Sequence, residues 1–213
     1  VVYMQVVRLN KRKILKNWTM TQMWEHLVFA HWPVAPEIAR QFVPEELQID
    51  TFEGDAWIGI ISFLMNGFKL KYMPFPYPFS FPEINIRTYV KVNGSPAIFF
   101  VTLDAADPCV VHVAKRWYHL PYYHAKMSFN REGDNSGFLF QSRRKGSATS
   151  PETFQAEFHP VSYPFIPREG TIEHWLTERY VFFTKDSRID TVYWGSVYHE
   201  PWTLQTAHGN ISV

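Results

Sequence analysis

The sequence predicts a single α+β domain made mostly of antiparallel β-strands, with two or three short helices. Apolar and polar residues alternate over Ile84–Val92, as in a strand with two different faces. Asn93-Gly94, a dipeptide typical of two-residue hairpin turns, joins this strand to a second apolar run over Pro96–Ala105. A third run, Ala56–Phe68, is long and almost continuously apolar, which indicates a buried strand.

The other elements follow in chain order. Further strands are expected over Met23–Trp32, Leu47–Asp50, Tyr122–Asn130, Ser136–Arg144, Phe154–Val161, Tyr180–Thr184 and Ile189–His199. Helices are expected after Ala35, with Pro36 near the first position, after the N-cap Asp107, and after the N-cap Thr171. We expect residues 1–17 to be an N-terminal lead-in and residues 18–213 to form the domain.

Composition argues against several classes of partner. With 21 Lys and Arg against 20 Asp and Glu, the net charge gives no electrostatic case for nucleic acid or anionic lipid. No apolar run approaches the roughly 20 residues of a membrane helix. The single cysteine, Cys109, excludes an intramolecular disulfide and fits a reducing compartment. We therefore expect a cytoplasmic protein with no nucleic-acid or membrane partner.

Motifs for metals and cofactors are missing from the sequence. None of the nine histidines forms an HxH or HExxH motif, and Cys109 has no second cysteine beside it. Neither a glycine-rich phosphate loop nor a GxSxG nucleophile motif occurs. We expect no metal and no cofactor.

The most informative stretch is MPFPYPFSFPEINIRTYVKV, residues 73–92. Its first half alternates proline with aromatic residues, which predicts an extended arm that covers a cavity mouth or a partner surface. In the second half, one strand face carries Glu83, Asn85, Arg87 and Tyr89. Glu83 and Arg87 lie roughly 13 Å apart on an extended strand, so each needs another partner. This face is either the polar wall of a pocket or a set of structural ion pairs at a barrel rim.

Three segments together resemble a known family: LVFAHWPVAPEIARQFVPEELQIDTFEGDAWIGIISF, FPEINIRTYV and AKRWYHLPYYHAKM. They are similar to the uncharacterised bacterial YqjF-like proteins, a family of unknown function in the acetoacetate decarboxylase-like superfamily. The resemblance covers Trp18 to about Trp202. It implies a closed or cone-like antiparallel barrel with an internal cavity.

The resemblance also bears on chemistry. In acetoacetate decarboxylase, a lysine whose pKa is lowered by a neighbouring cation forms a Schiff base with the substrate. The segment that best matches its lysine pair is Leu120-Pro121-Tyr122-Tyr123, which implies that both lysines are replaced by tyrosines. Tyrosine cannot form an imine, whereas the cavity glutamate of the decarboxylase has a match in Glu83. The resemblance therefore implies the fold but not the decarboxylase reaction.

Three functions remain open. The first is binding of a small organic molecule with a carbonyl or carboxylate group in the cavity. The second is a lyase- or hydratase-like enzyme with Glu83 as general acid/base; if its chemistry needed an amine, Lys126 or Lys115 would have to replace the lost lysine. The third is a structural module whose aromatic arm docks on a second copy, giving a homo-oligomer. The candidate site residues are Glu83 as the catalytic group and, for ligand binding, Arg87, Asn85, Tyr122, Tyr123 and Lys126. We expect Glu83 and Arg87 to point into one enclosed cavity with Tyr122 or Tyr123.

Overall fold

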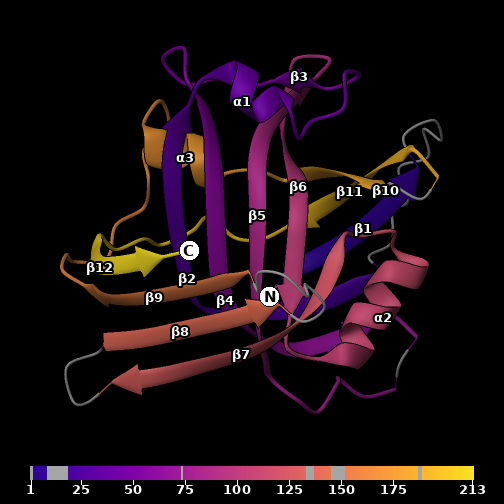
Figure 1. Cartoon of the computed structure of the whole chain (residues 1–213), viewed down its shortest axis with the longest axis vertical. Coiled ribbons are helices and arrows are strands. Elements are labelled where there is room, and N and C mark those ends of the chain that lie inside the picture. Colours follow the sequence, from indigo (N-terminus) through magenta and orange to yellow (C-terminus); the bar gives the residue numbers. More distant parts are fainter. Residues whose placement is uncertain (1, 9–18, 73, 133–136, 145–151, 187–188) are drawn as a thin grey trace.

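The molecule is mostly β-sheet with three short helices (Figure 1). The computed structural model describes residues 2–8, 19–72, 74–132, 137–144, 152–186 and 189–213. Within these ranges the strands are β1 (Val2–Arg8), β2 (Met20–Val34), β3 (Gln48–Ile49), β4 (Ala56–Leu70), β5 (Phe81–Val92), β6 (Ser95–Ala105), β7 (Tyr122–Glu132), β8 (Gly137–Arg144), β9 (Thr153–Pro160), β10 (Val181–Asp186), β11 (Thr191–Tyr198) and β12 (Ala207–Ser212). The helices are α1 (Pro36–Arg40), α2 (Pro108–Trp117) and α3 (Ile172–Thr177).

The strands form one strongly curled mixed sheet. Hydrogen-bonded pairs can be followed in a ring from β5 through β6, β10, β11, β1, β2 and β4 back to β5. β6 is the branch point of this sheet, because one edge pairs with β5 while the other pairs first with β10 and then with β7. From β7 the sheet continues into β8, β9 and β12, and β8 and β9 cross in front of β2 and β4 (Figure 1). The predicted barrel-like, mostly antiparallel sheet is confirmed, although β6–β10 and β6–β7 are parallel pairs.

The hairpin between β5 and β6 forms as the sequence predicts. Asn93 and Gly94 both adopt positive φ, 50° and 77°, which is the geometry that a type I′ turn requires. The two strands pair from Val92↔Ser95 to Glu83↔Ala105, with one register shift after Ile86. This pairing fixes which residues of β5 face the inside of the curled sheet.

Apolar layers cover both faces of β5. The larger core lies on the inner face and includes Phe63, Tyr89 and Leu103. On the outer face, Ile84 packs with Phe140 of β8 and neighbouring aromatic residues, so β8 and β9 cover this side. Because both faces of β5 are covered, the polar side chains on this strand must find their hydrogen-bond partners within the protein. A polar side chain there without a partner therefore points to a candidate binding site.

Two helices begin at capping residues that the sequence predicts. The Asp107 carboxylate accepts hydrogen bonds from the backbone N–H groups of Cys109 (2.8 Å) and Val110 (3.1 Å), at the start of α2. Thr171 accepts from His174 N–H at 3.4 Å at the start of α3. The second carboxylate oxygen of Asp107 accepts from the Tyr77 hydroxyl at 2.8 Å, so one side chain both caps α2 and tethers the arm.

We predict that Asp107→Ala lowers the free energy of unfolding by about 1–2 kcal/mol, because it removes the cap and the tether together. Urea denaturation followed by circular dichroism measures the loss. Tyr77→Phe is the matched control, since it removes the tether but keeps the cap, and should have the smaller effect. Equal losses for the two variants would show that the cap contributes nothing.

The aromatic arm is only partly covered. Phe81 is buried, and Tyr77 packs against the inner core beside Phe68, whose carbonyl accepts from Tyr77 N–H at 2.6 Å. Phe75 and Phe79 stay exposed, at 76% and 62%. The arm therefore closes one end of the inner core, and the expectation that its exposed rings meet a partner stays a prediction.

Two strands lie where none was expected. β1 lies in the expected lead-in and pairs with β11 and β2, and β12 pairs with β9. Both are joined to the sheet through residues distant in sequence, which local patterns do not reveal.

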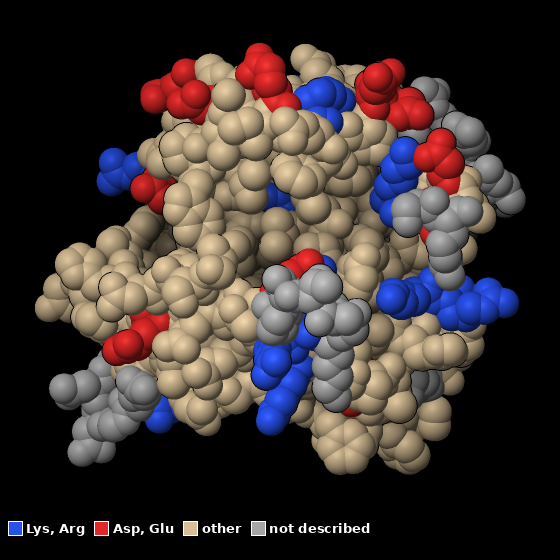
Figure 2. All heavy atoms as spheres, viewed as in Figure 1, with Lys and Arg blue, Asp and Glu red and all other residues tan. Residues whose placement is uncertain are grey.

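Acidic side chains gather at the end of the molecule that carries α1 and β3 (Figure 2). No helix in the described ranges is long and apolar enough to span a membrane.

Candidate functional site

The polar face of β5 points into the inner core. Glu83, Asn85, Arg87 and Tyr89 are exposed by only 2%, 3%, 6% and 0%. Their partners across the sheet on β6 are Ala105, Leu103, Phe100 and Ile98, all members of the inner core. The predicted shared face is therefore confirmed, and it is a buried wall rather than a solvated surface.

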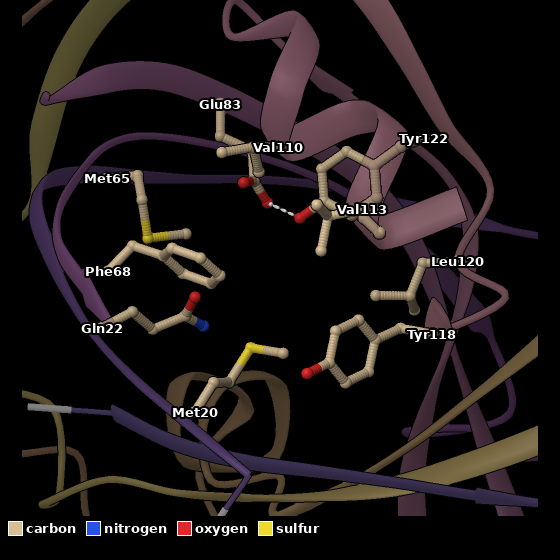
Figure 3. A pocket seen from close by; sticks show the side chains of 11 residues that line it. Met20, Gln22, Met65, Phe68, Glu83, Val110, Val113, Tyr118, Leu120 and Tyr122 are labelled. Atoms are coloured by element: carbon tan, nitrogen blue, oxygen red, sulfur yellow. Dashed lines mark hydrogen bonds between the residues drawn. The ribbon is translucent and has the colours of Figure 1, made fainter. Parts of the chain in front are cut away.

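Glu83 and Tyr122 lie together at one cavity (Figure 3). The Tyr122 hydroxyl donates to Glu83 Oε1 at 2.7 Å, while the buried Oε2 has no hydrogen-bond partner among the described residues. β7 positions Tyr122, because the first residues of this strand pair with the end of β6 beside Glu83. The cavity volume is about 30 Å³, enough for one or two water molecules. Its walls are formed by Met20, Gln22, Met65, Phe68, Val110, Val113, Ala114, Tyr118 and Leu120.

The carboxyl group of Glu83 is an acid that keeps its proton at neutral pH. Burial raises the pKa of Glu83 from 4.5 to about 8; the hydrogen bond from Tyr122 opposes this shift and the charge of Asp104 adds to it. Because the Tyr122 hydroxyl donates to Oε1, the proton of the neutral acid belongs on the unpartnered Oε2. The group can thus donate a hydrogen bond, or a proton, to a molecule in the cavity.

Arg87 and Asn85 line a second cavity, of about 20 Å³, on the same inner face. The Arg87 guanidinium donates from Nη2 to the Leu176 carbonyl at 3.1 Å, and Nε is buried without a partner in the described parts of the chain. Asn85 Oδ1 is buried and unpartnered in the same sense. The remaining walls come from Trp24, Phe29, Ile98, Phe100, Thr177, Arg179, Val181, Phe182, Val197, His199 and Trp202.

The two arginines of this cavity differ in charge balance. Arg179 forms an ion pair with Asp50 at 2.7 Å, with side-chain exposures of 2% and 1%, and its Nε donates to the Trp175 carbonyl at 2.7 Å. For Arg87 there is no ion pair with any residue that the structure describes. Its guanidinium carbon instead lies 5.7 Å from the ring centres of Phe29 and Tyr89. The positive charge of Arg179 is thus neutralised by Asp50, whereas the described residues supply no counter-charge for Arg87.

His31 adds a neutral group beside Arg87. Burial, reinforced by the charge of Arg87, lowers the pKa of His31 from 6.5 to about 3. Its Nε2 lies 2.6 Å from the Tyr89 hydroxyl. Gly59, across the sheet from Arg87, makes room for this ring, because a Cβ at this position would lie 2.6 Å from His31 Nε2.

The structure brings together four of the six candidate residues. Glu83 with Tyr122, and Arg87 with Asn85, line two cavities on one face of β5 rather than a single cavity. Tyr123 and Lys126 lie elsewhere: Tyr123 is 42% exposed with its ring 4.2 Å from the Arg144 guanidinium, and Lys126 is exposed. The reason is that β7 lies beside β6 only over Tyr122–His124. Beyond His124 it pairs with β8 instead. The expectation of one shared cavity, and of Lys126 facing it, is therefore wrong in geometry.

Several residues of the site have no sequence signal. His31, Arg179 and His199 lie on elements far from β5 in the chain, and nothing in their local patterns distinguishes them from ordinary core residues. A buried arginine after a short helix, at Arg179, is the nearest to a usable clue. Among the residues that line the two cavities there is no lysine, and the described ranges contain no cluster of three or more potential metal ligands.

A family model and one sequence relative each match most of the chain. A family model described as an uncharacterized conserved protein matches residues 21–212. The Bacillus subtilis (strain 168) protein described as uncharacterized protein YqjF is 39% identical over 197 residues, which cover 92% of this chain and 79% of that protein. The resemblance inferred from the three sequence segments is thus confirmed.

Solved structures confirm the fold. The enduracididine biosynthesis enzyme MppR, complexed with pyruvate, superposes with a TM-score of 0.57 at 10% identity, covering 96% of this chain and 79% of that one. Acetoacetate decarboxylase from Legionella pneumophila superposes with a TM-score of 0.54, also at 10% identity, covering 96% and 89%. At this identity the likeness concerns the curled-sheet architecture alone.

Proposed function

Because the chain belongs to the DUF2071 family of uncharacterized conserved proteins and has an acetoacetate decarboxylase-like fold, we propose that it binds a small organic anion on the inner face of its curled sheet. The observation that carries this proposal is the buried charge of Arg87, which forms no ion pair with the residues that the structure describes. An uncompensated buried charge costs several kcal/mol, and an anionic ligand would remove most of that cost. The unpartnered Nε supplies a hydrogen bond for such a ligand.

A carboxylate is the anion that these groups fit best. The planar guanidinium matches the two oxygens of a carboxylate, whereas a lysine would offer only a point charge. The apolar rings of Trp24, Phe29 and Trp202 suit a short carbon chain rather than a polyanion. The cavity, about 20 Å³, holds only one or two water molecules in the empty protein, so its walls must rearrange to admit even a short carboxylate.

A second function is supported by the neutral acid at Glu83. A protonated carboxyl group with a free Oε2, held by Tyr122 at the edge of a cavity, is suited to protonate a carbonyl or alkene substrate. Such an enzyme would be lyase- or hydratase-like and would use no Schiff base, in keeping with the absence of lysine from both cavity linings. Binding is the first claim, and this reaction is the alternative.

We predict that small carboxylates stabilise the protein and that Arg87→Met abolishes this effect. Pyruvate, the molecule present in the MppR complex, is the first probe, with propionate beside it. A ligand at 100 times its Kd adds about 2.7 kcal/mol of stability. Thermal unfolding with increasing ligand measures this, and isothermal titration calorimetry gives the Kd.

The matched control is Arg143→Met, which removes an exposed arginine of β8 and should leave binding unchanged. Unchanged binding in Arg87→Met would move the site away from Arg87. Absence of binding of both carboxylates to the wild-type protein would refute the proposed function.

A further inference from the structure

The cavity at Arg87 also contains His199, a histidine that neither the sequence nor the fold comparison singles out. His199 lies directly after β11, two residues before Pro201, and is only 6% exposed. It lines the same cavity as Arg87 and Asn85, although it comes from the opposite end of the chain. A histidine in this position is either a packing residue or a group that contacts the ligand.

The tautomer of the neutral His199 ring is fixed by one hydrogen bond. Nδ1 lies 2.8 Å from the Glu200 carbonyl oxygen, and because a carbonyl only accepts, the proton of the neutral ring is on Nδ1. Nε2 is then a lone-pair acceptor. Among the described residues Nε2 makes no hydrogen bond, although it is not one of the side-chain atoms that are both fully buried and unpartnered.

The ring is also held in place by stacking. The Tyr180 ring lies 4.7 Å away at an interplanar angle of 22°, and the Trp202 ring lies 4.7 Å away on an angle of 35°. The Tyr180 hydroxyl in turn donates to Glu178. A buried imidazole with fixed tautomer, fixed orientation and a free acceptor is preorganised to receive a hydrogen bond.

We propose that His199 Nε2 accepts a hydrogen bond from the ligand whose carboxylate is bound by Arg87. This inference rests on the proposed function, and it narrows the ligand class. The site then selects a short carboxylate that carries an O–H donor near the carboxyl group, such as a 2-hydroxy acid. A keto acid or an unsubstituted acid of the same length leaves the Nε2 lone pair without a partner, which lowers its affinity. His199 is in this sense a specificity-determining residue.

Three carboxylates with the same three-carbon skeleton test the proposal. Lactate has a hydroxyl at the second carbon, pyruvate a carbonyl and propionate only hydrogens. Isothermal titration calorimetry on the full chain should give a Kd for lactate about tenfold or more below the Kd for propionate. In His199→Phe, which keeps an aromatic ring between Tyr180 and Trp202, the preference should fall to within about twofold, with propionate binding retained.

The outcomes separate this inference from the proposed function. If none of the three acids binds the wild-type protein, the anion site itself is wrong. If all three bind equally, or if His199→Phe keeps the preference for lactate, the role of His199 is refuted while the anion site stands. Arg87→Met should lose all three acids.

A second measurement is made on the wild-type protein, and a variant serves only to assign one resonance. With histidines labelled with ¹⁵N, the Nε2 resonance of His199 should shift on adding lactate and stay in place on adding propionate. The assignment of the resonance comes from its loss in His199→Gln. The absence of a lactate-dependent shift would overturn the proposal.

Discussion

Asp50→Asn is expected to lower the free energy of unfolding by about 3–5 kcal/mol, because it removes the counter-charge of a buried arginine. The Asp50 and Arg179 side chains are 1% and 2% exposed and lie 2.7 Å apart. Burial lowers the pKa of Arg179 and the Asp50 carboxylate opposes that shift, which shows how strongly the guanidinium depends on this partner. Lys91, the second cation on Asp50, is 38% exposed and can return to water.

Equilibrium unfolding in urea measures this loss, and two further variants interpret it. Asp190→Asn breaks the exposed Lys185–Asp190 pair, a contact of similar length at 2.6 Å, and should change stability little. The double variant Asp50→Asn/Arg179→Met should lose less than Asp50→Asn alone, because no charge is left buried without a partner. A loss below about 1 kcal/mol for Asp50→Asn would contradict the buried pair.

The second large effect is a dependence of stability on pH that two buried groups set in opposite directions. Glu83 has its pKa raised from 4.5 to about 8, so its contribution is fully present below 4.5 and is lost as the pH rises through 8. His31 has its pKa lowered from 6.5 to about 3, so its contribution is present above 6.5 and is lost as the pH falls towards 3. Between 4.5 and 6.5 the folded and unfolded states bind equal numbers of protons at these two groups.

We therefore expect a plateau of stability between these two values, with a decline on each side. Above pH 6.5 the decline should reach about 1.4 kcal/mol per pH unit, because the folded state keeps the Glu83 proton that the unfolded state has lost. Urea unfolding at half-unit steps of pH measures the profile. A maximum of stability above pH 8 would contradict it.

Glu83→Gln isolates the contribution of the acid. Glutamine keeps an acceptor for the Tyr122 hydroxyl and imitates the protonated carboxyl group. The stability of this variant relative to the wild-type protein should increase by about 1.4 kcal/mol per pH unit between 4.5 and 8. Glu157→Gln, at an exposed position of β9, should show no such trend. A constant difference at all pH values would mean that Glu83 is ionised in the folded protein.

Tyr122 and Tyr123, although adjacent in the sequence, lie in different environments. Tyr122 lies where its hydroxyl can bind Glu83, and Tyr123, the next residue, points to the other side of β7 and contacts Arg144. Only the first tyrosine of the pair therefore belongs to a cavity. The inner face thus carries a neutral acid at Glu83 in one cavity and a cation at Arg87 in the other.

The sequence by itself determined the local structure of this protein and one face of its site. Alternation along β5 placed Glu83, Asn85, Arg87 and Tyr89 on one side, and Asn93-Gly94 and Asp107 defined the hairpin and the start of α2, because period-two geometry, turn chemistry and capping depend on neighbouring residues. It also indicated the family, through three segments whose match the comparisons confirm.

Only the tertiary structure decided which of these residues meet. β7 pairs with β6 for three residues and then continues beside β8. Tyr122 therefore reaches Glu83, while Lys126 does not reach the cavity. Arg179 and His199 reach the inner face from elements about 100 residues away from β5 in the chain, and Asp50 neutralises one arginine and not the other. The change of β6 from pairing with β10 to pairing with β7, and the pairing of buried charges, depend on contacts between segments distant in the chain. No periodicity in the sequence predicts such contacts.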